Sequence, residues 1–167
     1  SSDLLGRPAG GAKATGQPDE PAAIIVLREG ESRPRGREYF SLTLADVLSR
    51  AGRRDEAIQT LGALANDPAA EAASRSAAID RLAAIGAVEP ALAGLEQVLK
   101  SPGGSTPARQ LQRAELLALL RRDAEAVKAL KGLLTPKPAD PVFVSSVAAA
   151  LRSLGETQAA DEAIAGI

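Results

Sequence analysis

Apolar residues recur along most of this chain at steps of three and four positions. The first such run contains Phe40, Leu42, Leu44, Val47 and Leu48. These steps place apolar side chains on one face of an α-helix, which can then bury that face against another element. Glycine or proline interrupts the pattern at intervals, as at Gly52 and Pro68. The pattern therefore predicts short helices joined by tight turns.

From residue 38 onwards the pattern predicts about eight helices, arranged as four hairpins with a first and a second helix each. The expected repeats cover residues 38–70, 71–105, 106–139 and 140–167. Residues 20–37 contain a short apolar stretch that could form a capping helix followed by a loop. Residues 1–19 are rich in Gly, Pro, Ser and Ala, and they cannot bury enough apolar surface to offset the entropy of ordering. We expect a flexible tail or linker there.

The four hairpins share one spacing. Each second helix has an alanine at the same place, and these residues are Ala57, Ala91, Ala126 and Ala160. Successive members are 34, 35 and 34 residues apart, and we call positions related by these steps equivalent. A near-constant period of helix-turn-helix units is typical of a solenoid, because a hairpin can bury its apolar face only against its neighbours. The fold expected is all-α, a right-handed superhelical solenoid of about four repeats. Ala22 precedes Ala57 by 35 residues, so one extra, degenerate helix could cap the N-terminal end.

The chain resembles the tetratricopeptide repeat family over about residues 38–167. In that pattern the first helix carries Leu-Gly and Tyr, the second carries Ala and Phe, and Pro follows. The Tyr slot holds Leu48, Leu82, Leu117 and Leu151, and the Phe slot holds Leu61, Leu95, Leu130 and Ile164. No aromatic residue is retained in these slots, and Arg121 stands where the turn glycine of the third repeat is expected. Spacing supports the resemblance more than identity does.

The resemblance also implies a working surface, because members of this family usually bind partners on the concave face, which the first helices line. Projected onto this chain, the partner-binding candidates are Tyr39, Leu42, Asp46, Arg50, Asp80, Leu111, Glu115 and Arg152. Asp46, Asp80 and Glu115 are equivalent positions and form an acidic row beside small residues. We expect a shallow groove for an extended or helical peptide with apolar anchors and some basic character. The alternative is that these acids are ordinary solvated helix surface.

Residues for catalysis are scarce. The chain has no His and no Cys, which excludes a Ser-His-Asp arrangement, a thiolate nucleophile and the common transition-metal clusters. The acids of Asp55-Glu56 and Asp161-Glu162 are adjacent, so they point about 100° apart on a helix. We expect a non-catalytic interaction scaffold without a cofactor. Two other roles stay open: an accessory domain of a larger enzyme, and a secretion chaperone for an unfolded client.

Net charge and hydropathy argue against nucleic acid as a partner and against insertion into a membrane. A formal net charge of −1 gives no electrostatic reason to bind nucleic acid. The longest strongly apolar run, residues 22–27, is too short to span a bilayer. The absence of cysteine and of an initiator Met slightly favours an exported or periplasmic protein. The chain ends at Ile167 inside an apolar helix with no polar cap, so we expect either a continuation or a homo-oligomer formed through this end.

Overall fold

The structure is a computed structural model that describes residues 20–32 and 36–167. In this part of the chain it contains nine α-helices and no β-strand, which confirms the all-α prediction. The helices are α1 (Ala22–Glu31), α2 (Arg37–Arg50), α3 (Arg54–Asn66), α4 (Ala72–Ala84), α5 (Val88–Lys100), α6 (Pro107–Leu119), α7 (Asp123–Leu133), α8 (Pro141–Ser153) and α9 (Thr157–Ala165). The extra N-terminal helix that the sequence left open is α1. The predicted tail, residues 1–19, lies outside the described residues.

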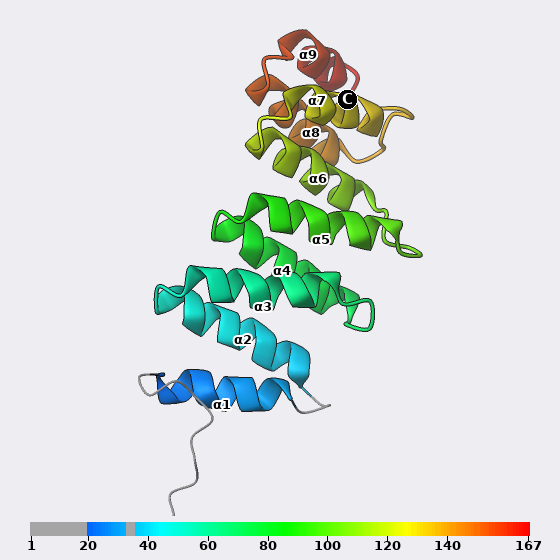
Figure 1. Ribbon diagram of the computed structural model, residues 1–167. Coiled ribbons are helices and arrows are strands. Elements are labelled where there is room, and N and C mark those ends of the chain that lie inside the picture. Colours follow the sequence, from blue (N-terminus) through cyan, green and yellow to red (C-terminus); the bar gives the residue numbers. More distant parts are fainter. Residues whose placement is uncertain (1–19, 33–35) are drawn as a thin grey trace, which may run out of the picture.

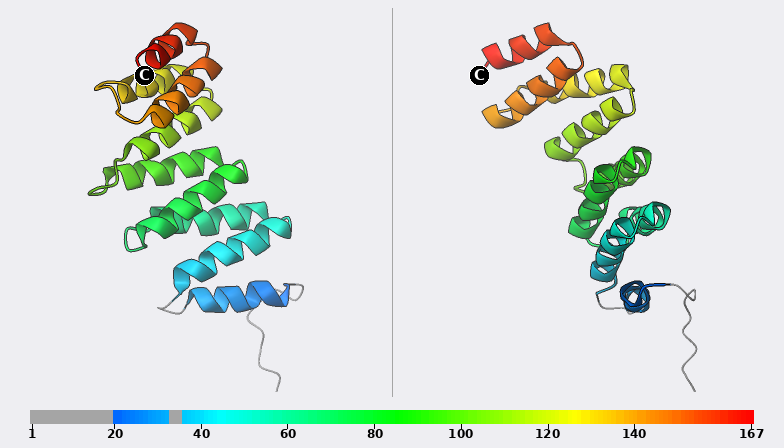
Figure 2. Two further views of the ribbon diagram at one scale, coloured as in Figure 1. Left: turned by 180° about the vertical axis from the view of Figure 1, so that it is seen from behind. Right: turned by 90° about the vertical axis from the view of Figure 1, so that its left-hand side faces the viewer.

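The stack of helices begins with α1 at one end and finishes with α9 at the other (Figure 1), and each helix contacts the next one along the chain. The first helices α2, α4 and α6 lie on one side of the stack and the second helices α3, α5 and α7 on the other (Figure 2). Helices two apart also touch in the first half, where α2 contacts α4 and α3 contacts α5. Neighbouring hairpins therefore cover one another's apolar faces.

The first helices of the third and fourth hairpins have clear start signals. Thr106 precedes Pro107, and its Oγ1 accepts a hydrogen bond from the backbone N–H of Arg109 at 3.3 Å. Asp140 precedes Pro141, and its Oδ1 accepts from the N–H of Val142 at 2.9 Å. A capping oxygen followed by proline satisfies a free N–H and fixes φ at the first helical position. These residues determine where α6 and α8 begin.

All four hairpin turns close in the same way. The residue that reverses the chain has a positive φ of 74° at Gly52, 75° at Gly86, 61° at Arg121 and 82° at Gly155. The N–H of the following residue donates 2.8–3.0 Å hydrogen bonds to the carbonyls of Leu48, Leu82, Leu117 and Leu151. This is a Schellman-type helix end, which favours glycine because a Cβ is strained at positive φ. The leucines aligned from the sequence are thus the carbonyl acceptors of four equivalent turns.

Replacing Arg121 by glycine is expected to raise the free energy of unfolding. A residue with a Cβ costs about 1–2 kcal/mol in the left-handed region, and the extra unfolded-state entropy of glycine cancels about half of that gain. The expected increase is about 0.5–1 kcal/mol in urea denaturation. The control is Arg122→Gly at a residue with φ of −88°, which should give no increase. An equal effect of both variants would contradict this account of the turn.

The hairpins are held together at buried alanines. The side chains of Ala57, Ala91, Ala126 and Ala160 are all 0% exposed. A small side chain at this place lets the second helix approach the first closely. Ala22 does not extend the series, because it is exposed, and Ile24 is instead the residue of α1 that belongs to the hydrophobic core.

Buried apolar residues form two clusters. The larger begins at Ile24 in α1 and continues to Ala126 in α7. The smaller joins Ala114 of α6 and Leu130 of α7 to buried residues of α8 and α9. Leu154, at the end of α8, packs against both clusters. Both clusters contain residues of α6 and α7, so the division of the core runs through the third hairpin.

Close contact between second helices depends on a glycine. A Cβ added at Gly94 of α5 would lie 2.8 Å from the Cβ of Ala65 in α3 and 3.3 Å from Cγ1 of Ile79. The equivalent pairs are Leu99 with Ala129, and Leu134 with Ala163. Each later pair is larger than Ala65 with Gly94, and side chains of greater volume require a wider spacing between the helices. The packing of second helices therefore becomes looser toward the C-terminal end.

Replacing Gly94 by alanine is expected to lower the free energy of unfolding. The added methyl overpacks the contact with Ala65, which costs about 1–3 kcal/mol, and better helix propensity returns up to about 1 kcal/mol. The matched control is Gly62→Ala in α3, where a Cβ would meet nothing within 4 Å. That variant should gain about 0.5–1 kcal/mol. Urea denaturation of both variants checks the prediction, and a gain in both would contradict it.

Candidate binding groove along the first helices

The eight residues predicted from the sequence all lie on the first helices, but not in one place. Leu42 and Leu111 pack against the two core clusters and are only partly accessible. Tyr39 is 67% exposed, and it lines a hollow between the start of α2 and the loop before α4, together with Asp67 and Glu71. The structure therefore separates Tyr39 from the other candidates.

The two predicted arginines differ as well. Arg50 is exposed and lines a cavity between α2 and α4. Arg152 is exposed and points to its own hairpin partner, because its Nη2 lies 2.6 Å from Oδ1 of Asp161 in α9. Only Arg50 is thus placed beside the groove between neighbouring first helices.

The three acids of the predicted row have three different environments. Asp46 accepts two hydrogen bonds from Arg81, at 2.9 Å from Nε and 3.2 Å from Nη2. Asp80 accepts from Nε2 of Gln112 at 2.8 Å. Glu115 is exposed and has no hydrogen-bond or ion-pair partner among the described residues, and the partial burial of its carboxyl raises its pKa above the usual range. The row is therefore not a uniform acidic surface.

Two cavities lie between first helices at equivalent places. The first, about 300 Å³, lies between α2 and α4. The second, about 590 Å³, lies between α6 and α8. Each of the eight residues that line the first cavity has its counterpart 69 residues later among those that line the second. This distance equals two successive repeat steps of 34 and 35 residues, so one cavity recurs two repeats further along the chain.

The side chains in the two cavities differ at the charged positions. The first cavity contains Asp46, Arg50 and Arg81. The counterparts in the second are Glu115, Leu119 and Ala150. The carboxylate is retained, whereas both arginines are replaced by apolar residues. The short side chain of Ala150 in place of Arg81 also accounts for part of the greater volume.

A second arginine contact found in the first half of the molecule is missing at the second cavity. In the first half, the guanidinium of Arg54 donates to the backbone carbonyl of Ile85 at 3.2 Å and 3.1 Å. The equivalent residues are Asp123 and Leu154, and both line the second cavity. Oδ1 of Asp123 is buried and has no hydrogen-bond partner among the described residues. A guanidinium that is present in the first half has thus become a carboxylate in the second.

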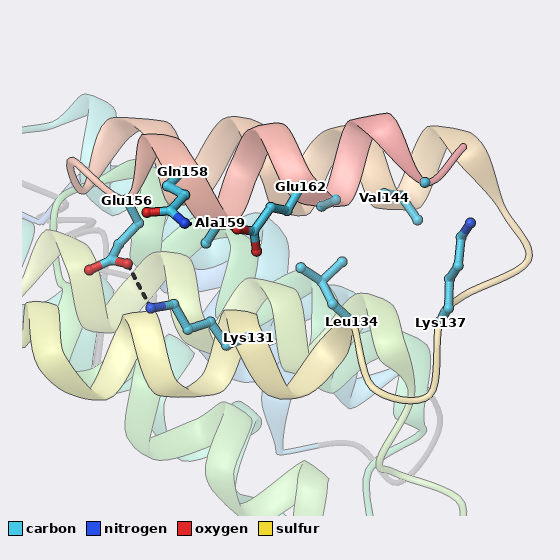
Figure 3. Close-up of a pocket in the computed structure, with 10 residues that line it drawn as sticks. Lys131, Leu134, Lys137, Val144, Glu156, Gln158, Ala159 and Glu162 are labelled. Atoms are coloured by element: carbon cyan, nitrogen blue, oxygen red, sulfur yellow. Dashed lines mark hydrogen bonds and ion pairs between the residues drawn. The ribbon is translucent and has the colours of Figure 1, made fainter.

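A third cavity lies between the second helices α7 and α9 (Figure 3) and has a volume of about 590 Å³. Leu134 and Ala163, the larger pair described above, are among its lining residues. Nζ of Lys131 lies 2.6 Å from Oε2 of Glu156 and bridges one end of the opening. The position of this cavity fits the wider spacing of the last second helices, and its cationic and anionic side chains are already paired at that end.

Metal and membrane chemistry have no candidate in the described part of the chain. No group of three or more His, Cys, Asp or Glu residues there could hold a metal ion. None of the helices described is long and apolar enough to cross a membrane.

Comparison with protein-family models, with curated proteins and with solved structures gave no match. The class of the protein thus comes from its fold, which is all-α and built of stacked, repeat-like helical hairpins.

Several residues of the second cavity were missed by the sequence reasoning. Ala150 and Leu119 carry no chemistry of their own, and Asp123 follows closely on the turn residue Arg121. The equivalence of positions could have identified them, because Ala150 occupies the place of Arg81. What the sequence did not supply was the pairing of Asp46 with Arg81, which is 35 residues away on the next first helix.

Replacing Glu115 by glutamine is expected to stabilise the fold at pH 7 and not at low pH. Burial raises the pKa of Glu115 in the folded state, so the folded protein binds the proton more tightly than the unfolded chain. Stability is then lost as the pH rises from the unfolded pKa through the folded one. Urea denaturation at pH 7 and below about pH 4 should show a gain for Glu115→Gln only at pH 7.

The control for this prediction is Asp46→Asn, which removes the carboxylate that Arg81 pairs with. It should lower the free energy of unfolding at pH 7 by about 0–1 kcal/mol, as expected for a partly exposed ion pair. A destabilised Glu115→Gln variant at pH 7 would mean that the Glu115 carboxylate is favourably placed in the folded state.

Proposed function

We propose that this protein is a non-catalytic interaction module that binds a protein or peptide partner along its first helices. The observation that carries the proposal is the recurrence of one cavity at two equivalent places, between α2 and α4 and between α6 and α8. Both are lined by small and apolar side chains together with charged ones. Spaced pockets of this kind suit an extended or helical peptide, whose side chains recur at regular intervals.

We also propose that the chain forms a tetratricopeptide-like solenoid. Support comes from the steps of 34, 35 and 34 residues, from the four equivalent left-handed turn residues and from the four fully buried alanines. In a solenoid of this type the first helices line the concave face, which is where such proteins present their binding surface. The proposed partner site and the proposed architecture therefore agree.

The make-up of the second cavity supports a binding role rather than a catalytic one. A nucleophile needs a base within hydrogen-bond reach. Ser146 and Ser153 line the cavity with Glu115 and Asp123, but no hydrogen bond joins either serine to either acid among the described residues. Ser146 Oγ instead donates to the carbonyl of Val142 at 3.0 Å, and Ser153 Oγ to that of Ala150 at 2.7 Å. Both hydroxyls are thus used within their own helix.

Filling the groove tests this function. Ala84 and Ala149 are exposed and line the first and second cavities. The double variant Ala84→Trp, Ala149→Trp is expected to block partner binding while leaving the core intact. The matched control is Ala63→Trp, Ala93→Trp, which adds the same two side chains at exposed positions of the second helices α3 and α5. Circular dichroism confirms folding before binding is compared.

The measurement is affinity capture from an extract of the source cells, with retained proteins identified by mass spectrometry. A partner held by the wild type and by the control but lost with the groove variant supports the proposal. Retention by both variants would place the partner elsewhere on the molecule. Retention of nothing by the wild type would remove the support for a stable protein partner.

A further inference from the structure

We propose that the cavity between α6 and α8 accepts an arginine side chain of the partner, in the place that Arg81 occupies in the cavity between α2 and α4. The inference rests on the proposed function, since it assumes a partner that lies along the first helices. It adds the chemistry of the group that is recognised: a guanidinium presented by a protein or peptide.

The first half of the molecule shows how this cavity holds a guanidinium. Arg81 of α4 points to Asp46 of α2 and donates through Nε to Oδ1 at 2.9 Å and through Nη2 to Oδ2 at 3.2 Å. This two-bond arrangement matches the planar fork of arginine to the two oxygens of a carboxylate. Both side chains are 37% exposed, so the pair lies in the groove and not in the core.

The second half keeps the acceptor and lacks the donor. Glu115 is equivalent to Asp46, and Ala150 is equivalent to Arg81. Glu115 has no ion-pair partner among the described residues. The cavity has a volume of about 590 Å³ against about 300 Å³ for the one that Arg81 lines. The second cavity therefore has a carboxylate and an unfilled volume at the place where the first cavity has a carboxylate and a guanidinium.

The charge beside the cavity also favours a cation. Asp123 replaces Arg54, and its Oδ1 is buried with no hydrogen-bond partner in the described part of the chain. A buried hydrogen-bond acceptor without a donor costs free energy. A guanidinium has five N–H groups and therefore supplies such a donor. The charged residues that line this cavity are one cation, Arg121, and two carboxylates, Glu115 and Asp123. The first cavity has the opposite balance, with one acid and two arginines.

Binding of a cation should be linked to proton release. The charged groups that line the cavity with Glu115 are Arg121 from the α6–α7 turn and Asp123 at the start of α7, while α8 contributes serines and alanines. A bound guanidinium stabilises the ionised form of the carboxyl, so affinity should increase as the pH rises through the pKa of Glu115. An uncharged ligand of the same size should not show this dependence.

The test uses N-acetyl-arginine methylamide as the probe, with the norleucine analogue as an uncharged control. Each is titrated into the full chain at neutral pH, and binding is followed by the NMR signals of the methyl groups of Ala118, Ala149 and Ala150 and of the Glu115 carboxyl. The arginine probe should shift these signals, and the norleucine analogue should not. Glu115→Gln should weaken probe binding about tenfold, the effect expected from losing one charge-assisted pair.

A reciprocal pair of variants tests the equivalence of the two cavities. Ala150→Arg should supply the missing guanidinium from within the chain, lower the pKa of Glu115 and abolish probe binding at α6 and α8. Arg81→Ala should vacate the first cavity and create a second probe site, seen as shifts at Ala45 and Asp46. If Ala150→Arg does not fold, Arg81→Ala and Glu115→Gln still decide the outcome.

Three results would overturn the inference: no shift with the arginine probe, equal shifts with norleucine, or unchanged affinity in Glu115→Gln. Failure of the arginine site can be distinguished from failure of the proposed function. A natural partner that is lost with Ala84→Trp, Ala149→Trp but binds Glu115→Gln as tightly as the wild type supports the groove and contradicts the arginine site. A partner unaffected by both contradicts both.

Discussion

The close contact of two helices at a buried alanine is the interaction on which the rest of this molecule depends. Each hairpin turn brings its second helix back across the first, and a fully buried alanine lets the two backbones approach. The left-handed turn residue fixes where this happens, because its helix-end hydrogen bond returns to a leucine carbonyl in every copy. Hairpins of constant shape result, and constant shape allows neighbours to stack with their apolar faces covered.

Variation between the hairpins then determines the surface. The contact of Ala65 with Gly94 holds α3 and α5 together, whereas its larger counterparts accompany an opening between α7 and α9. On the side of the first helices, an arginine lines the first of two equivalent cavities and an alanine lines the second. A repeated backbone thus carries different sites, because the substitutions fall on side chains that do not hold the hairpin together.

The sequence was sufficient for the helices, the turns and the buried alanines, since each depends on residues within one hairpin. It was not sufficient for contacts between hairpins. The pairing of Asp46 with Arg81 depends on how α2 and α4 face each other, and a long side chain can reach several positions. Tyr39 was expected in the groove but lines a separate hollow, because it sits in the first turn of α2. Ala22 fitted the spacing but not the packing, since it is exposed and Ile24 is the apolar side chain of α1 that reaches the core.

The division of the core has a consequence for how binding would be felt inside the protein. The larger cluster contains 19 buried residues and the smaller one six, so α8 and α9 depend on a small cooperative unit. Regions with few buried contacts open locally more often than the rest of a molecule. The cavity between α6 and α8 borders this unit, so a ligand there would slow amide hydrogen exchange mainly in the last two hairpins. Binding in the groove would therefore reduce local opening mainly at the C-terminal end of the stack.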